Sequence, residues 1–237
     1  MSRIQLEPAY VIHNRPFRET SLIVEAFTRE HGRIAVVARG AKSARSRWRN
    51  VLQPFRPLLL SWSQKSDLGT LTAADQVASP PALQGQALYC GLYLNELLYR
   101  LTARQDACPG LYDDYVHSIG RLIETSSVEP VLRSFEVCML AHLGIGLSLE
   151  KDNVGRPIVG GRGYRYDIES GPVASAGGTP GEVDGETLLA LRSGQFNDAK
   201  VLKQARLLMR RIIDHHLEGR PLNSRQLFQR PGPSTNQ

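Results

Sequence analysis

A dense cluster of cationic side chains lies between positions 39 and 49 of the 237-residue sequence. Five cations accompany one aromatic residue there: Arg39, Lys42, Arg45, Arg47, Trp48 and Arg49. Clustered cations attract a polyanion and gain free energy from counterion release, and an aromatic ring can stack on a base. Gly40, Ser43 and Ser46 favour a loop over the amphipathic helix that would bind a membrane. The segment therefore predicts a loop that binds nucleic acid.

The charge of the chain is divided into three regions. Lysine and arginine number 29 against 23 aspartate and glutamate, a net charge of +6. Residues 1–50 carry ten basic and four acidic side chains, residues 51–199 carry 11 and 17, and residues 200–237 carry eight and two. Two basic ends that flank an acidic middle indicate a polyanionic partner, although the alternative is ordinary solvated surface charge.

Three features that could indicate an enzyme or a metal site lack the required spacing. Residues 40–43 resemble a phosphate-binding loop only weakly, because that motif needs glycine directly before the lysine. His215 and His216 are adjacent, so they point about 100° apart on a helix, and no further ligand follows at a suitable spacing. Asp113 and Asp114 fall in the first turns of an expected helix, where acidic residues complement the helix dipole. We therefore predict no catalytic residue, no cofactor and no metal.

The three cysteines, Cys90, Cys108 and Cys138, are odd in number and widely separated. This usage is typical of reduced thiols in a cytosolic protein. The N-terminal residues lack the basic, apolar and small-residue regions of a secretory signal, and no apolar stretch reaches the length of about 18 residues that a membrane span needs. We expect a cytoplasmic protein that does not bind membranes.

Residues 1–79 predict a small β-barrel. Apolar, β-branched segments at 10–12, 21–27, 33–38, 54–62 and 70–74 alternate with turns that contain glycine or proline. Five short strands fit an OB-fold, a common platform for single strands, and equally an SH3-like barrel. The Ser79–Pro81 segment then marks a domain boundary.

Residues 80–230 predict a mainly α-helical domain. Apolar residues recur at helical spacing over 83–101, 111–123, 130–143 and 201–213. Residues 151–185 are rich in glycine and proline and predict an irregular insert, and residues 231–237 predict a disordered tail. Glu96 lies on a largely apolar helix, so its carboxylate needs either solvent or a cationic partner. Arg133 fits either a solvated helix face or the rim of an apolar groove that binds a peptide with an aromatic residue and a carboxylate.

Five segments, 15–22, 32–42, 52–55, 91–98 and 221–228, resemble the bacterial recombination mediator and DNA repair family RecO, in the family's order through nearly the whole chain. The resemblance implies an α+β multidomain fold, an N-terminal OB-fold β-barrel followed by a mainly α-helical domain. It also implies a protein without enzymatic activity. Some members hold a four-cysteine zinc site, but residues 151–185 contain no cysteine, so the chain resembles the metal-free branch.

By the same resemblance, the protein would bind single- and double-stranded DNA and anneal complementary strands in the cytoplasm, in association with the nucleoid. It would act with RecR to load RecA onto DNA coated by single-stranded DNA-binding protein, whose acidic C-terminal tail docks on the mediator. Arg33, Arg39 and Lys42 map to the DNA-binding part of the barrel. Arg133 maps to the tail-binding pocket, to which we also assign Lys203.

Two other functions fit the composition. One is a generic OB-fold protein that binds RNA or serves translation, which would prefer RNA over DNA of the same sequence because of the 2′-hydroxyl. The other is a metal-dependent nuclease, which the poor clustering of carboxylates places last.

Overall fold

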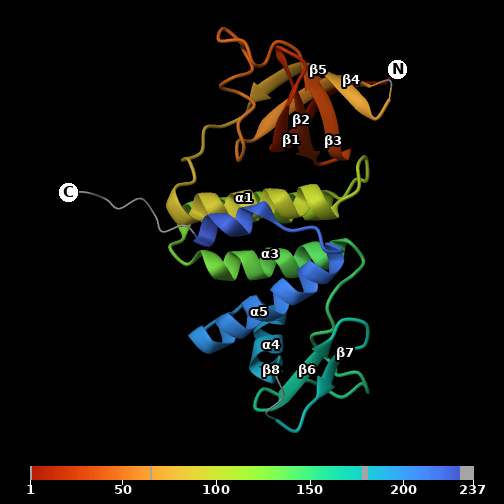
Figure 1. The fold of residues 1–237 in the computed structure, drawn as a ribbon, viewed down its shortest axis with the longest axis vertical. Coiled ribbons are helices and arrows are strands. Elements are labelled where there is room, and N and C mark those ends of the chain that lie inside the picture. Colours follow the sequence, from red (N-terminus) through yellow and green to blue (C-terminus); the bar gives the residue numbers. More distant parts are fainter. Residues whose placement is uncertain (1, 65, 178–180, 230–237) are drawn as a thin grey trace, which may run out of the picture. The chain divides into compact units, whose positions relative to one another are not determined.

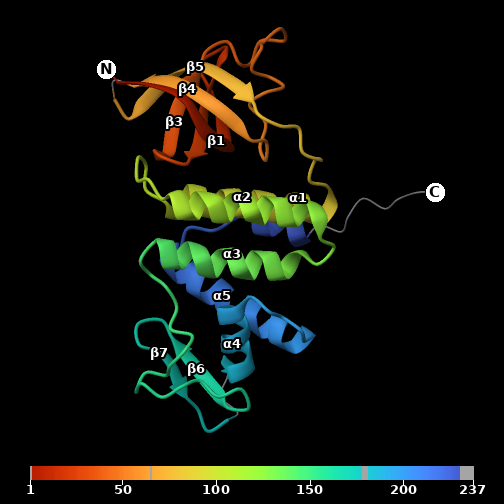
Figure 2. The same cartoon turned by 180° about the vertical axis from the view of Figure 1, so that it is seen from behind.

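The computed structural model describes residues 2–64, 66–177 and 181–229. It divides into two compact units, the first made of residues 2–124 with 222–229 and the second of residues 125–221 (Figure 1; Figure 2). The predicted change from strands to helices near residue 80 is present, but the first two helices belong to the same unit as the strands. The predicted disordered tail, residues 231–237, lies outside the described residues.

Five strands of the first unit form a closed barrel in the order β1-β2-β3-β5-β4. The strands are β1 (Ser2–Phe17), β2 (Ser21–Thr28), β3 (Gly32–Ala38), β4 (Leu58–Gln64) and β5 (Leu68–Gln76). Neighbours are antiparallel except β3 and β5, which pair in parallel over three residues from Ala35–Leu68 to Val37–Thr70. β1 is much longer than predicted because it pairs with both β2 and β4 and so closes the barrel. The predicted small barrel is confirmed.

The barrel interior is filled by side chains that alternate along each strand, as the period of two requires. Val24, Ala26, Val36 and Leu60 are fully buried, and Trp62 is 1% exposed. β2 departs from simple alternation, since nearly all of its residues are buried. This happens because the outer face of β2 is covered as well.

The cover consists of α1 (Gly85–Leu101) and α2 (Pro109–Glu124), and the short 3-10 helix η1 (Asn223–Gln229) packs on α1. Tyr10 and Phe27 of the barrel pack against Tyr112 and Tyr115 of α2, with the Tyr10 and Tyr115 ring centroids 5.3 Å apart. Burial raises the pKa of the Tyr10, Tyr112 and Tyr115 hydroxyls, which therefore stay neutral. The aromatic cluster joins the barrel and α2 into one core.

Glu96 of α1 accepts hydrogen bonds at the start of η1. Its carboxylate accepts from the backbone N–H of Asn223 at 2.9 Å and from the N–H and hydroxyl of Ser224 at 2.8 and 2.7 Å. Arg100, one turn further along α1, lies 3.7 Å away. The half-buried carboxylate thus has both a cation and backbone donors, and it holds the start of η1 against α1.

A buried ion network ties the β2–β3 hairpin to the loop between α1 and α2. The fully buried carboxylate of Glu25 contacts Arg33 at 3.0 Å and also Arg104. Arg33 donates further to the carbonyl of Thr102 at 2.9 and 3.2 Å. The loop approaches so closely that a Cβ at Gly32, whose φ is +61°, would lie 1.9 Å from a backbone oxygen of the loop. Only glycine fits at this position.

The second unit contains α3 (Val128–His142), β6 (Gly163–Asp167), β7 (Gly171–Ala174), β8 (Glu182–Asp184), α4 (Gly185–Ser193) and α5 (Ala199–His216). The predicted helices at 130–143 and 201–213 are present as α3 and α5. None of the described helices is long and apolar enough to cross a membrane.

The interpretation of residues 151–185 as irregular is corrected by a three-stranded antiparallel sheet of order β7-β6-β8. The strands have three to five residues, too few for an alternating pattern to stand out. The hydroxyls of Tyr164 and Tyr166 accept from backbone N–H groups at 2.9 and 3.1 Å, and the buried Asp152 carboxylate accepts from two more. These hydrogen bonds hold the surrounding turns.

We expect Glu25→Gln to lower the free energy of unfolding by about 3 kcal/mol, because it leaves two guanidinium groups without their buried carboxylate. Urea denaturation followed by fluorescence measures the change. The matched control is Asp75→Asn on the exposed side of β5, which should not shift the midpoint. Equal midpoints for both variants would contradict a structural role for the network.

Candidate nucleic-acid interface

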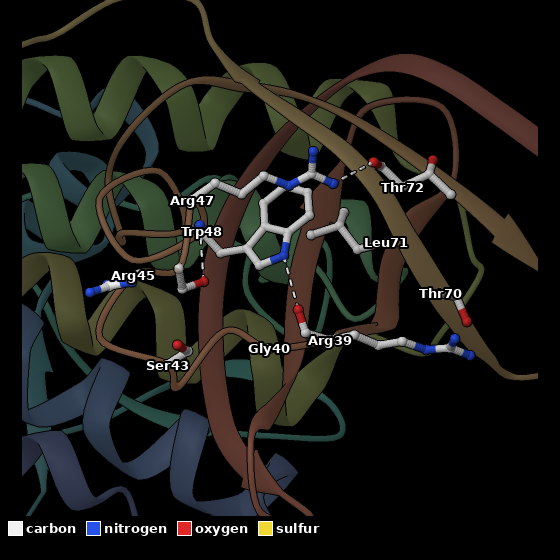
Figure 3. Close-up of a pocket in the computed structure, with 10 residues that line it drawn as sticks. Arg39, Gly40, Ser43, Arg45, Arg47, Trp48, Thr70, Leu71 and Thr72 are labelled. Carbon is white, nitrogen blue, oxygen red and sulfur yellow. Dashed lines mark hydrogen bonds between the residues drawn. The ribbon is translucent and has the colours of Figure 1, made fainter.

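The basic loop, residues 39–49, connects β3 to the segment before β4 and is anchored by Trp48. The Trp48 side chain is 7% exposed and belongs to the barrel core, where it joins Ala41 and Leu52. Its indole N–H donates to the carbonyl of Arg39 at 3.2 Å, which draws the two ends of the loop together (Figure 3). Three successive backbone hydrogen bonds, from Ser43 to Gly40, Ser46 to Ser43 and Arg49 to Ser46, shape the turns between.

The expected base-stacking role of Trp48 is corrected by this geometry. The indole lies in the core, and the guanidinium of Arg47 covers it at 4.1 Å from the ring (Figure 3). Arg47 also donates to the carbonyl of Thr72 at 3.4 Å. A base therefore has no open face of this ring to stack on, and Trp48 acts as an anchor.

The loop borders an open pocket of about 630 Å³ on the barrel surface. Its lining includes Arg39, Ser43, Arg45 and Arg47 from the loop and Thr70 and Thr72 from β5. Figure 3 shows the Arg39 and Arg45 side chains extending to opposite sides of the anchored indole. The two threonines were not singled out from the sequence, because only the parallel pairing of β3 with β5 brings them to the loop.

Four cations of the basic loop, Arg39, Lys42, Arg45 and Arg49, are exposed. No ion pair between residues that the structure describes joins any of the four to a carboxylate. Their charge is therefore available to an external anion, and the adjoining threonines and serines can donate hydrogen bonds to phosphate oxygens.

Arg33 lies elsewhere, which corrects its expected place in the DNA-binding surface. It stands near the start of β3, six residues before Arg39, or roughly 20 Å along an extended strand. Its side chain is 13% exposed and is bonded to Glu25 and Thr102. Arg33 stabilises the junction between the barrel and the helices and is not among the cations that face outward at the loop.

The second unit holds the two residues expected to bind an acidic tail. Arg133 of α3 is 6% exposed and pairs with Glu136 one turn later, and its Nε has no hydrogen-bond partner among the described residues. Lys203 lies on the exposed face of α5. The same two helices are linked by an ion pair of 3.1 Å between Glu129 and Arg206. Arg133 is thus a buried cation, unlike the solvated helix face that was its alternative.

The residues considered for catalysis or metal binding have structural partners. Asp113 pairs with Arg29 at 3.0 Å, and the guanidinium lowers the pKa of the carboxyl. The rings of His215 and His216 meet edge to face, with their centroids 5.2 Å apart. Within the described part of the chain, no three histidine, cysteine, aspartate or glutamate side chains are grouped to hold a metal ion. The three cysteines are free thiols.

We expect Trp48→Leu to lower the free energy of unfolding by about 3 kcal/mol, because it removes a large core side chain and its hydrogen bond to Arg39. Arg45→Ala, on the same loop but exposed, is the control and should leave the urea midpoint unchanged. If Trp48→Leu were as stable as the parent chain, the indole would not anchor the loop.

The comparisons with known proteins cover nearly the whole chain. Residues 1–80 match the family described as Recombination protein O N terminal, and residues 82–226 match Recombination protein O C terminal. The DNA repair protein RecO of Aromatoleum aromaticum is 47% identical over 231 residues, covering 95% of each chain. The DNA repair protein RecO of Methylococcus capsulatus is 46% identical over 228 residues, covering 96% of this chain and 94% of the relative. The chain therefore belongs to the RecO family of DNA repair proteins, with an α+β architecture in which an OB-fold barrel precedes a helical region.

Proposed function

We propose that this protein is a recombination mediator without enzymatic activity. It binds single- and double-stranded DNA, anneals complementary strands and, with RecR, helps to load RecA onto DNA coated by single-stranded DNA-binding protein. The observation that carries the DNA-binding part is the anchored basic loop, whose exposed cations lie beside an open pocket. The RecR and RecA steps rest on the resemblance to the family alone.

The basic loop acts on the phosphates of the strand. Arg39, Lys42 and Arg45 are exposed on the loop, so each can neutralise a phosphate. Two complementary strands repel each other through their backbones, and a surface that neutralises both lowers this barrier. Annealing then needs no covalent step and no catalytic residue, because base pairing itself supplies the driving force.

The acidic tail of the coating protein binds in the second unit at Arg133 and Lys203. Arg133 offers a donor, Nε, that no described residue accepts, in a largely apolar setting. A carboxylate that reaches this donor gains a charge-assisted hydrogen bond that is strengthened by burial. Lys203 adds an exposed positive charge, which favours a peptide of several acidic residues.

We expect the combined substitution of Arg39, Lys42 and Arg45 by alanine to weaken the salt dependence of single-stranded DNA binding. About six phosphate contacts give a log–log slope of roughly −4, and loss of three contacts leaves about −2. Fluorescence anisotropy of a labelled oligonucleotide at several salt concentrations measures both slopes. A control variant with the same change in net charge, Arg121, Arg156 and Arg162 to alanine, replaces exposed arginines away from the loop and should keep the parent slope. An unchanged slope in the loop variant would remove this loop from the site.

We expect the protein to accelerate duplex formation between complementary oligonucleotides coated with single-stranded DNA-binding protein. The acceleration should disappear when the coating protein lacks its acidic tail, and it should fall about tenfold with Arg133→Ala. Bare oligonucleotides are the control, since their annealing should not depend on Arg133. Binding to bare strands without any acceleration would contradict the mediator function, and a preference for RNA of the same sequence would favour an RNA-binding protein instead.

A further inference from the structure

A second open pocket, of about 640 Å³, lies at the turn between β1 and β2. Its lining includes Phe17, Arg18, Glu19, Arg39 and Thr70. Arg39 and Thr70 also line the pocket of the basic loop, so the two pockets adjoin. A backbone hydrogen bond of 2.9 Å from Lys42 to Thr20 fixes the basic loop beside this turn. The two pockets therefore form one path across the barrel surface.

Phe17 offers the aromatic surface that Trp48 does not. It is half-buried at the end of β1, and the pairing of its backbone with Ser21 of β2 fixes its position. The guanidinium of the exposed Arg18 lies 5.2 Å from the centroid of the ring. Because Arg18 belongs to the turn rather than to the core, its side chain can move aside, whereas Arg47 is also bonded to Thr72. The Phe17 ring can thus be uncovered without disturbing the barrel.

The charges around the ring are suited to one stacked base and its two flanking phosphates. Arg18 and Arg39 are exposed cations in the lining of the pocket, and Glu19 is the acidic residue of the same lining. A base on the ring would leave its flanking phosphates within reach of the two guanidinium groups. The Glu19 carboxylate repels a nearby phosphate, so its charge lowers the affinity for single-stranded DNA.

We propose that Phe17 stacks a base of single-stranded DNA whose flanking phosphates contact Arg18 and Arg39. This inference rests on the proposed function, since it adds base stacking to the phosphate contacts of the basic loop. Bases in a duplex are already stacked and paired, so the Phe17 contact is made only with a single strand. The Phe17 contact therefore adds affinity for single strands only, while the basic loop binds both forms through phosphates.

The test compares Phe17→Leu with the parent chain on labelled oligothymidylate and on a duplex of equal length. We expect about tenfold weaker binding of the single strand, the size of one lost stacking contact. The salt slope should stay unchanged, because no phosphate contact is lost, and duplex affinity should stay unchanged as well. Glu19→Gln is the matched control in the same pocket and should bind the single strand more tightly.

Phe17→Trp keeps an aromatic ring and reports on the contact directly. Its single-strand affinity should equal or exceed that of the parent chain, and oligothymidylate should quench the fluorescence of the new indole. The stacking proposal would be overturned if Phe17→Leu bound the single strand as tightly as the parent chain does. It would also be overturned if the fluorescence of Phe17→Trp were not quenched in the saturated complex. If the parent chain bound single-stranded DNA with no dependence on salt, the proposed function would be overturned instead. Failure of the stacking proposal and failure of the proposed function therefore give different results.

Discussion

The burial of the Trp48 indole is the constraint on which the proposed DNA-binding surface depends. A loop that contains one glycine, two serines and five cations would otherwise populate many conformations and lose entropy when it binds. The indole packs into the barrel and bonds to the carbonyl of Arg39, so both ends of the loop are held. The exposed arginines and lysine are then presented beside β5 before any DNA arrives.

The role of each cation depends on whether its side chain contacts a carboxylate or an open pocket. Arg33 and Arg104 contact the buried Glu25, and Arg29 pairs with Asp113, so these three stabilise the junction between the barrel and the first helices. Arg39 and Arg45 face an open pocket instead. A count of charges in the first fifty residues therefore overstates the number that can reach DNA. Roles within one basic segment are divided between folding and binding.

Much of the fold could be predicted from local patterns. The alternating segments of the barrel and the helical spacing of α1, α2, α3 and α5 were recognised because each element carries its own periodicity. The basic loop was also predicted as a loop.

Other features depend on contacts between residues distant in sequence. The burial of Trp48 requires the barrel, the pairing of Arg33 requires Glu25, and the grouping of α2 with the barrel requires the tyrosine cluster around Phe27. The pocket beside Phe17 depends on such a contact as well, since it exists only when the β1–β2 turn lies beside Arg39. The short strands β6 to β8 carried too few residues to show a period.

In the proposed complex, single-stranded DNA lies across the barrel, along the path from the basic loop to the β1–β2 turn. Photo-crosslinking of the intact protein to an oligonucleotide that contains 5-iodouracil, with the attached peptides identified by mass spectrometry, tests it most directly. We expect crosslinks in the peptides that contain Phe17 and residues 39–49. Crosslinks confined to residues 125–221 would contradict it.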